Sequence, residues 1–392
     1  MQHNISLLVG LKNNLEYTQF FYKTTRALYP EVEIIFVSYG STDGTHQWLD
    51  KLEDEHVRYF YSFEVKTLAD TYNKCIDLAT KEYVIFLHND IVLTPNFIEN
   101  IEKNITSDNV IFYTTIEPPI FEGHERPGKI IKDFGSEIKS LRITDLYQFS
   151  IERQNTEHRQ SKDGICLFMG LAREQVAKTG GLDNLFNPMF CEDDDLILRL
   201  KLSGLKIFTE LDAICYHFVS KTSRFSDEYK TKTQLIESNS QRNFFRKWTF
   251  SNASIIQKKY DIALVVSNCD EKTLQQTEPY CSMIYVDCDF QNYILQEQHN
   301  TKFDLSERIK PIQALMPHQV VVRFNAKRFS NHAFHILQNL SSIITKQGAK
   351  KETFFTKLYP YHKRVRKNIF HIEIESFDSH ENQLIKLFQG HN

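Results

Sequence analysis

The first part of the chain alternates short apolar runs with segments whose apolar residues recur at helical spacing, and no other feature constrains the fold as strongly. Residues 5–9, 33–37, 57–61 and 83–87 have the length and composition of strands. Between them, most clearly over 66–79, apolar residues follow the spacing of a helix. Strands that alternate with helices predict βαβ units and therefore a mostly parallel sheet.

Polar segments follow three of these strands, at residues 10–13, 38–43 and 88–90. Each is polar or contains glycine, as a binding edge requires. Because ligands of parallel sheets bind beyond the carboxyl ends of the strands, we expect these segments to line a site.

The remainder of the chain predicts a less regular segment and then a second domain. Residues 116–162, with several Pro and Gly, predict a long loop region of the kind that often forms a lid. A chain of 392 residues is long for one hydrophobic core. We therefore expect an α/β domain over 1–250 and a smaller α/β accessory domain over 255–392. Within the second domain the patterns predict strands at 261–267, 283–287, 319–324 and 368–375 and a helix over 333–345.

Composition excludes several classes of protein. The net charge of −3 gives no electrostatic footprint for nucleic acid. No segment approaches the run of about 18 apolar residues that spans a bilayer, and the N-terminus lacks the pattern of a signal peptide. The seven cysteines form no CxxC pair and several lie in apolar runs, which predicts reduced thiols that act as small core residues. We expect a cytoplasmic location.

Four acidic residues in succession, Glu192–Asp195, begin a predicted helix that is followed by a short strand at 206–209. The helix dipole offsets part of their mutual repulsion, so a solvated helix start is the simpler interpretation. The flanking residues are apolar, however, among them Phe190 before the acids and Leu196 after them. Acids enclosed in this way are candidates for catalysis or metal binding.

Asp90 and His217 are two further candidates. Asp90 ends an apolar strand, where α/β enzymes place site residues, and its carboxylate suits Mg²⁺ or Mn²⁺. A plain turn after the strand is the competing interpretation. His217 lies in an apolar stretch, where a lone histidine is more often structural than a ligand.

Several motifs then follow one another in an order that resembles family 2 glycosyltransferases with the GT-A fold, over about residues 4–225. Each is weak alone, and their order and spacing carry the resemblance. They are Ile5 to Asn13, Val37-Ser38-Tyr39-Gly40-Ser41-Thr42-Asp43-Gly44-Thr45, Ala69 with Asn73, the strand ending at Asp90, Gly180-Gly181-Leu182-Asp183, and Glu192-Asp193-Asp194-Asp195-Leu196-x-x-Arg199.

The resemblance implies a GT-A-like domain that binds a nucleotide-diphosphate sugar and transfers a hexose to a hydroxyl acceptor. It implies that Asp90 holds Mn²⁺ or Mg²⁺ at the diphosphate, with His217 as a further ligand. It makes Asp193 the general base of an inverting reaction, with Glu192 orienting that base or contacting the acceptor. It places the nucleotide-sugar-binding residues at Leu11, Lys12, Ser38, Tyr39, Asp43, Asn73 and Asn89.

The chain departs from the family pattern at two places. Ser38 and Tyr39 replace the paired aspartates that usually recognise the nucleotide. His88-Asn89-Asp90 keeps only the last acid of the Asp-x-Asp motif, and one carboxylate fewer should weaken metal binding. A degenerate domain that acts as a binding or scaffold module is therefore one alternative. A nucleotidyltransferase is another, although residues 10–13 are too poor in Gly and Arg for it.

Partners follow from the same resemblance. We expect a glycan or lipid-linked glycan acceptor, in polysaccharide or surface-glycan synthesis, and no nucleic acid. The C-terminal part is basic between Lys350 and Lys367, with interleaved aromatic residues. An ordinary solvated face is the favoured interpretation, and peripheral contact with an anionic membrane is the alternative. Homo-oligomer formation is one role that the accessory domain could have.

Overall fold

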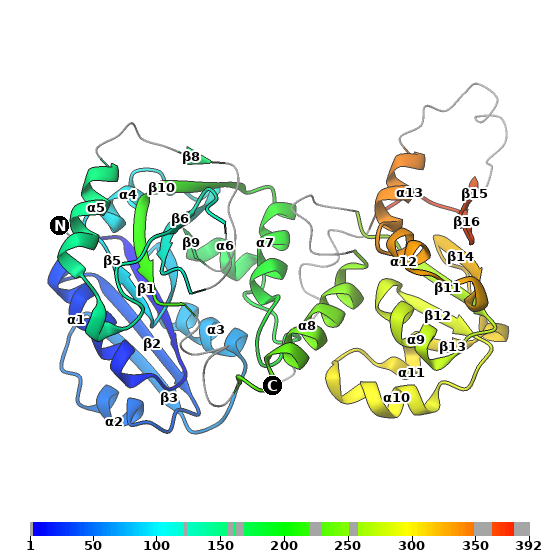
Figure 1. Ribbon diagram of the computed structural model, residues 1–392, viewed down its shortest axis with the longest axis horizontal. Helices are drawn as coiled ribbons and strands as arrows, with labels where there is room; N and C mark the ends of the chain where they lie inside the picture. Colours follow the sequence, from blue (N-terminus) through cyan, green and yellow to red (C-terminus); the bar gives the residue numbers. More distant parts are fainter. Residues whose placement is uncertain are drawn as a thin grey trace. The chain divides into compact units, whose positions relative to one another are not determined.

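A computed structural model describes residues 3–120, 124–154, 160–161, 168–219, 229–250, 258–348 and 363–379. The chain divides into two compact units, Met1–Ile236 and Glu237–Phe388 (Figure 1). Each unit contains one sheet with helices packed against it. The expected fold class, a mixed α/β architecture with a parallel-rich sheet and a smaller second α/β unit, is confirmed.

The first unit contains a ten-stranded sheet in the order β3-β2-β1-β4-β9-β6-β10-β5, with β7 paired to β6 and β8 to β10. Its elements are β1 (Ile5–Leu11), α1 (Leu15–Leu28), β2 (Glu33–Tyr39), α2 (Thr45–Asp50), β3 (Val57–Ser62), α3 (Leu68–Leu78), β4 (Tyr83–His88), β5 (Ile91–Leu93), α4 (Phe97–Glu102), β6 (Asn109–Glu117), β7 (Lys129–Ile131), the 3₁₀ turn Ile138–Ser140, α5 (Ile143–Gln154), β8 (Gln160–Ser161), β9 (Met169–Ala172), α6 (Arg173–Lys178), α7 (Glu192–Leu202) and β10 (Lys206–His217). The helix α8 (Thr233–Trp248) contains the boundary between the units.

Helices cover both faces of this sheet. On one face, α1, α2 and α4 contribute Phe21, Leu49 and Phe97 to the core, and on the other α3 and α7 contribute Tyr72 and Leu196. The strands β1, β2 and β4 are therefore buried almost throughout, which is why they read as continuous apolar runs in the sequence.

Two expectations for this unit were wrong in detail. The described parts of residues 116–162 are more regular than their Pro and Gly content predicts, because they contain α5, which packs Leu146 against strand residues of the sheet. The prolines and glycines cluster at the start of this segment, so they hide the helical signal that follows. The strand expected at 206–209 continues as β10 to His217, past a register shift between Glu210 and Ile214.

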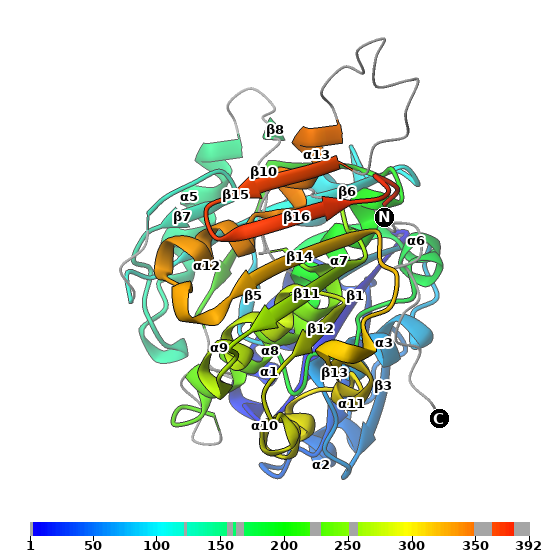
Figure 2. The same ribbon diagram turned by 90° about the vertical axis from the view of Figure 1, so that its right-hand side faces the viewer.

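The second unit contains a six-stranded sheet in the order β13-β12-β11-β14-β16-β15, which Figure 2 shows face on. The first four strands are parallel, and the last two pair antiparallel. Its elements are β11 (Ile262–Ser267), α9 (Glu271–Thr277), the 3₁₀ turn Glu278–Tyr280, β12 (Met283–Val286), α10 (Gln291–Glu297), the 3₁₀ turn Gln298–Asn300, α11 (Leu305–Arg308), β13 (Ile309–Pro311), the 3₁₀ turn Ile312–Ala314, β14 (Val320–Asn325), the 3₁₀ turn Ala326–Arg328, α12 (Asn331–Gln338), α13 (Leu340–Gly348), β15 (Lys363–Lys367) and β16 (Phe370–Ile374).

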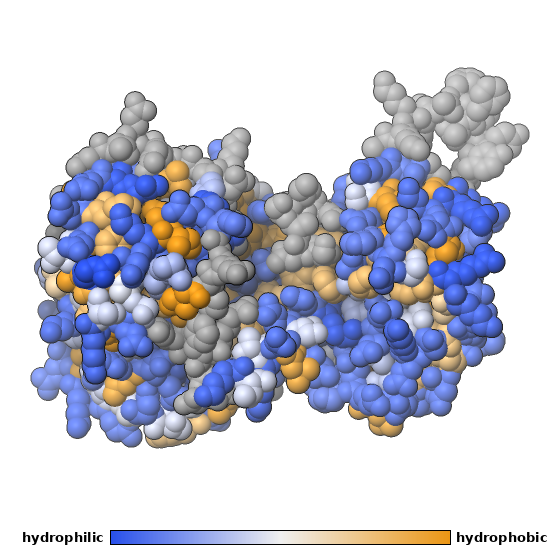
Figure 3. Space-filling model, viewed as in Figure 1, coloured by the Kyte–Doolittle hydropathy of each residue, from blue (hydrophilic) through white to orange (hydrophobic). Residues whose placement is uncertain are grey.

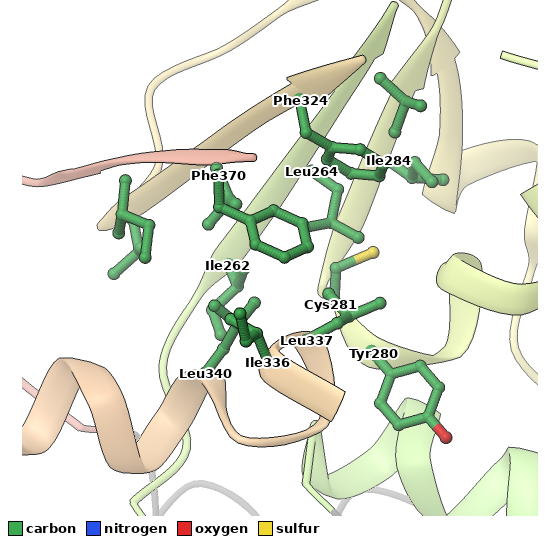
Figure 4. Packing of buried hydrophobic residues seen from close by; sticks show 14 of the residues in the cluster. Ile262, Leu264, Tyr280, Cys281, Ile284, Phe324, Ile336, Leu337, Leu340 and Phe370 are labelled. Carbon is green, nitrogen blue, oxygen red and sulfur yellow. The ribbon is translucent and has the colours of Figure 1, made fainter. Parts of the chain in front are cut away.

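The core of the second unit lies between the sheet and its helices. Phe324 and Phe370 from neighbouring strands pack with Leu264, and Leu337 and Leu340 face them from α12 and α13 (Figure 4). The helix expected over 333–345 is divided in two, because α12 ends at Gln338 and α13 begins at Leu340.

A buried charge network joins four segments of this unit. Arg246, on α8, donates to both carboxylate oxygens of Glu278 at 2.7–3.1 Å. Arg308 donates to the same carboxylate at 3.0 Å, and Arg242 donates to Glu297 at 2.8 Å. Burial alone would raise the pKa of Glu278, but the guanidinium groups of Arg246 and Arg308 lower it to about 2. Pairing with the arginines therefore keeps Glu278 ionised although it is buried.

Two observations concern the surface and the thiols. On the face shown in Figure 3, hydrophilic side chains predominate on each unit and apolar ones form small scattered groups. Among the helices in the described part of the chain, none has the length and apolarity needed to cross a bilayer. The six cysteines of the described ranges are thiols, and Cys75, Cys215 and Cys281 are buried. Cys166 and most of the basic C-terminal segment lie outside the described residues.

Replacing Glu278 by Gln should lower the free energy of unfolding of the second unit by about 3 kcal/mol, because Arg246 would lose its main counter-ion while staying buried. The pKa of Glu278 is lower in the folded than in the unfolded chain, so its stabilisation is present above about pH 4.3 and is lost as the pH falls toward 2. The variant should therefore lose less stability on acidification. Denaturant unfolding followed by Trp248 fluorescence, in a Trp48→Phe background, measures both effects.

The exposed Glu307, which pairs with Lys310, provides the control. Glu307→Gln should leave the unfolding midpoint unchanged. A Glu278→Gln variant as stable as Glu307→Gln would contradict the importance of the network.

Candidate functional site

Strand pairing brings three site residues together at the carboxyl edge of the first sheet. His88 is the last residue of β4, and Asp90 lies in the turn between β4 and β5. The antiparallel pair β5–β10 places His217, the last residue of β10, opposite Ile91. The backbone N–H of Phe218 then donates to the carbonyl of Asp90 at 3.0 Å. His217 is therefore next to His88 and Asp90 in space, although it is far from them in the sequence.

The side chains of His88, Asp90 and His217 form a group that could hold a metal ion. One ligand atom from each lies within 4.8 Å of the others. The Nε2 atom of His217 lies 3.4 Å from Oδ1 of Asp90, and both residues are buried. Two imidazole nitrogens and a carboxylate are donors that suit Mn²⁺ and other divalent transition metals.

A second carboxylate lies on the other side of the His217 ring. Glu117 ends β6, and its Oε1 lies 3.6 Å from Nδ1 of His217. Its Oε2 lies 2.6 Å from Nζ of Lys129, on β7. The strand β6 runs parallel to β10 with Ile116 opposite Tyr216, so this register accounts for the proximity.

The surroundings give the two histidines opposite electrostatic characters. Burial lowers the pKa of His88 to about 4, so its imidazole is neutral at neutral pH and has a nitrogen lone pair for a cation. Burial also lowers the pKa of His217, but the carboxylates of Asp90 and Glu117 outweigh it and raise the pKa to about 9. A position where two carboxylates stabilise positive charge is suited to a cation.

Aromatic side chains form one wall of this group. The ring of Phe168 lies 5.0 Å from the rings of both His88 and His217, measured between centroids. A small pocket adjoins the group on this side, and Phe168, Glu117 and Lys129 are among its lining residues. Phe168 therefore gives both histidines an apolar neighbour.

The four acids at the start of α7 have different environments. Asp195 is fully buried and accepts two hydrogen bonds from Arg199, at 2.7 and 2.9 Å, so it is structural. Glu192 is 5% exposed, and burial followed by repulsion from Asp193 raises its pKa well above the usual range. Asp193 is half-buried, so its carboxylate is the more accessible of these two.

The helix α3 links this acidic start to the strand ends. The hydroxyl of Tyr72 donates to the carbonyl of Leu87, next to His88. The ring of Tyr72 belongs to the same buried cluster as Leu196 of α7. The helix α3 therefore packs with α7 and bonds to the end of β4.

Asn73 holds the turn that precedes α7. Its side-chain amide donates to the carbonyl of Leu182 at 2.8 Å and accepts from the N–H of the same residue at 2.8 Å. Gly181 has a φ of 71°, and a Cβ there would lie 2.4 Å from Oδ1 of Asn73, so a glycine is required. The polar groups of Asn73 are thus used within the protein.

Side chains also join the turns after β1 and β2. Nζ of Lys12 donates to the carbonyl of Gly40 at 2.8 Å. The carboxylate of Asp43 accepts from the N–H of Leu15 at 2.8 Å and from the hydroxyl of Thr45 at 2.6 Å. These bonds fix the expected nucleotide-binding edge as one rigid surface.

The other predicted nucleotide-sugar-binding residues differ in exposure. Leu11, Ser38 and Asn89 are buried. The hydroxyl of Ser38 bonds to Ser41 and His46, and the amide of Asn89 donates to Thr18 at 3.0 Å. Tyr39 is half-buried, and its ring packs 5.7 Å from that of Phe60, measured between centroids. Asp43 is exposed and Lys12 and Tyr39 are half-buried, so these three are the accessible side chains of this set at this edge.

The sequence of residues 6–179 matches the model of glycosyl transferase family 2. These residues form a family 2 glycosyltransferase domain. The resemblance inferred from the motifs is confirmed over this range, which includes His88 and Asp90 and ends before the acids of α7 and His217. No curated protein sequence matches the chain.

Several solved structures are similar to the chain at low identity. The mannosyltransferase PcManGT from Pyrobaculum calidifontis, in complex with GDP-Man and Mn²⁺, is 16% identical with a TM-score of 0.43, over 63% of this chain and 64% of that one. GalNAc-T7 with UDP, GalNAc and Mn²⁺ is 12% identical with a TM-score of 0.41, over 54% and 42%. TarS 1–349 of S. aureus is 14% identical with a TM-score of 0.40, over 62% and 72%. The match spans less than two thirds of the first two structures.

The motif analysis missed two members of the site in the family 2 domain. His88 was noted only as a departure from Asp-x-Asp, although a histidine at a strand end is itself a potential ligand. Glu117 ends the strand β6, which the patterns did not predict. The apolar residues of β6 before Glu117 were the signal available.

Replacing Asn73 by Ala should lower the free energy of unfolding of the family 2 domain by about 2 kcal/mol, because both bonds to Leu182 are lost. Asp77→Ala, at an exposed position of the same helix, should have no such effect. Denaturant unfolding followed by Trp48 fluorescence, in a Trp248→Phe background, compares the two. Equal stability of the two variants would show that the turn before α7 does not need this residue.

Proposed function

We propose that the chain is a metal-dependent glycosyltransferase that moves a hexose from a nucleotide-diphosphate donor to a hydroxyl of a glycan acceptor. One observation carries the proposal: in the unit whose residues 6–179 match family 2, His88, Asp90 and His217 gather at the sheet edge to which Tyr72 of α3 bonds, and α3 also packs with α7. A scaffold module would have no need to bury these ionisable groups together, since taking ionisable groups out of water costs free energy.

The donor set fits a divalent metal ion. His88, Asp90 and His217 would hold Mn²⁺ or Mg²⁺, which when bound supplies positive charge to the diphosphate leaving group. The chain supplies the rest of the electrostatic environment. Asp90 and Glu117 keep the region around His217 attractive to cations, and the ring of Phe168 packs against His217.

Asp193 is our candidate for the general base. It lies in the first turn of α7 and is half-buried, so it can reach an acceptor hydroxyl. Glu192 has a raised pKa and would remain protonated beside Asp193. Its carboxyl group could then donate a hydrogen bond and would add no negative charge next to the base. The left-handed backbone of Phe190 and Cys191 just before α7, with φ of 77° and 70°, is the kind of strain that accumulates at functional sites.

On the donor side we assign two kinds of role. Lys12 and Tyr39 are accessible at the edge and would contact the nucleotide, with Tyr39 available to stack on the base. Leu11, Ser38, Asp43, Asn73 and Asn89 would act by holding the edge, since they are buried or bonded within the protein.

The finer features of the reaction rest on the family resemblance. Inversion at the anomeric carbon, a glycan or lipid-linked acceptor, a role in surface polysaccharide synthesis and a cytoplasmic location are the proposals that accompany it. Peripheral membrane contact by the basic C-terminal segment is the alternative to an ordinary solvated face. The described part of that segment is the strand β15, which includes Arg364, Arg366 and Lys367.

Asp193→Asn should lower the transfer rate about 100- to 10,000-fold, the usual worth of a general base, while leaving Mn²⁺ and donor binding intact. Asp90→Ala should lose both metal binding and transfer. The measurements are nucleotide release from a panel of nucleotide-diphosphate sugars with Mn²⁺ or Mg²⁺, and calorimetry with metal and nucleotide. Asp194→Asn, the neighbouring acid in the same helical turn, is the matched control and should stay within a few-fold of the wild type.

An Asp193→Asn variant as active as Asp194→Asn would reject Asp193 as the base. If the wild-type chain bound neither nucleotide nor metal in calorimetry, the scaffold alternative would replace the enzyme.

A further inference from the structure

The ring of His217 is placed between two carboxylates that contact different nitrogens. Nε2 faces Oδ1 of Asp90 at 3.4 Å, and Nδ1 faces Oε1 of Glu117 at 3.6 Å. Only Asp90 belongs to the group of donor atoms that lie within 4.8 Å of one another, together with His88 and His217. Glu117 therefore lies behind His217, on the side of the ring away from that group.

Glu117 is itself fixed by the fold. Its second oxygen lies 2.6 Å from Nζ of Lys129, and the strand β7 that carries Lys129 pairs with the end of β6. Lys129 contacts Oε2, so Oε1 is the oxygen of Glu117 that faces Nδ1 of His217. A carboxylate oxygen accepts hydrogen bonds, and a histidine that binds a metal ion through Nε2 has its remaining proton on Nδ1.

We propose that Glu117 is a positioning residue for the metal site: it holds the proton of His217 on Nδ1 and so directs the lone pair of Nε2 toward Asp90 and His88. Histidine ligands commonly donate their other ring N–H to a carboxylate, which fixes the tautomer and the ring orientation and strengthens the ligand. The inference rests on the proposed function, because it assumes that the His88, Asp90 and His217 group binds a divalent ion. It adds a residue that the motif pattern does not include.

The chain departs from Asp-x-Asp at the position where this arrangement matters. His88 stands where the motif has a carboxylate, so the group offers two imidazoles and one carboxylate and depends more on its two histidine donors. A correctly oriented His217 compensates part of that loss. Lys129 thus positions Glu117, and Glu117 in turn positions the ring of His217 and its Nε2 atom.

The test is calorimetric titration of the full chain with Mn²⁺ alone. Glu117→Gln should weaken Mn²⁺ binding roughly 10- to 100-fold, the range typical of a lost carboxylate partner of a ligand histidine. Glu33→Gln is the matched control, since Glu33 is also a buried carboxylate of this sheet but bonds to Ser6 and Thr80. It should bind Mn²⁺ as the wild type does. Circular dichroism and thermal unfolding verify that each variant is folded.

A second readout follows the tautomer directly. In ¹⁵N spectra of the Zn²⁺-bound chain, with His217 assigned from His217→Gln, Nδ1 should be protonated and Nε2 should carry the metal-bound shift. A structural role for Glu117 would not require this pattern. Metal on Nδ1 of His217 would overturn the inference.

The remaining outcomes are distinguishable. A Glu117→Gln affinity within two-fold of the wild type would overturn the inference while leaving the metal site in place. Complete loss of binding, equal to that of Asp90→Ala, would also overturn it by making Glu117 a ligand. If the wild-type chain and Asp90→Ala both failed to bind Mn²⁺, the proposed metal site itself would fall, and this inference with it.

Discussion

The candidate site depends on the position of β10 between β6 and β5. It pairs parallel with β6 and antiparallel with β5, so its last residue lies next to the ends of both. His217 is thereby placed between Asp90, in the turn before β5, and Glu117, at the end of β6. Without the short antiparallel strand β5, the turn after β4 would not be tied to β10 at all. The register of β5, β6 and β10 thus brings together ionisable side chains that lie far apart in the sequence.

Buried charges are compensated to different degrees at different places in the protein. In the second unit, Glu278 is surrounded by Arg246 and Arg308, and its pKa is lowered to about 2. At the candidate site of the first unit, burial raises the pKa of Glu192, and His217 contacts its carboxylate neighbours only at ion-pair distances. Paired charges specify a structure, whereas incompletely compensated ones carry a free-energy cost that function explains.

The structure shows what the residues at the two departures from the family motifs, Ser38 and His88, do instead. Ser38, which replaces an aspartate, bonds to Ser41 and His46 and is buried. It therefore contributes to the rigidity of the edge, and recognition of the nucleotide passes in our proposal to Lys12 and Tyr39. At the other departure, His88 replaces a carboxylate but still offers a donor atom to the same group. Both changes alter the chemistry of the edge.

The sequence by itself determined the parallel-rich architecture, the strand ends that form the edge, and Asp90 with the acids of α7 as candidates. These follow from local periodicity and from motif order, which need no knowledge of distant contacts. Tertiary structure decided which polar groups are available: Asp195 is bonded to Arg199, whereas Asp193 is accessible. It also decided that His88 and Glu117 belong beside His217, because strand register and burial arise only when segments distant in the chain pair with one another.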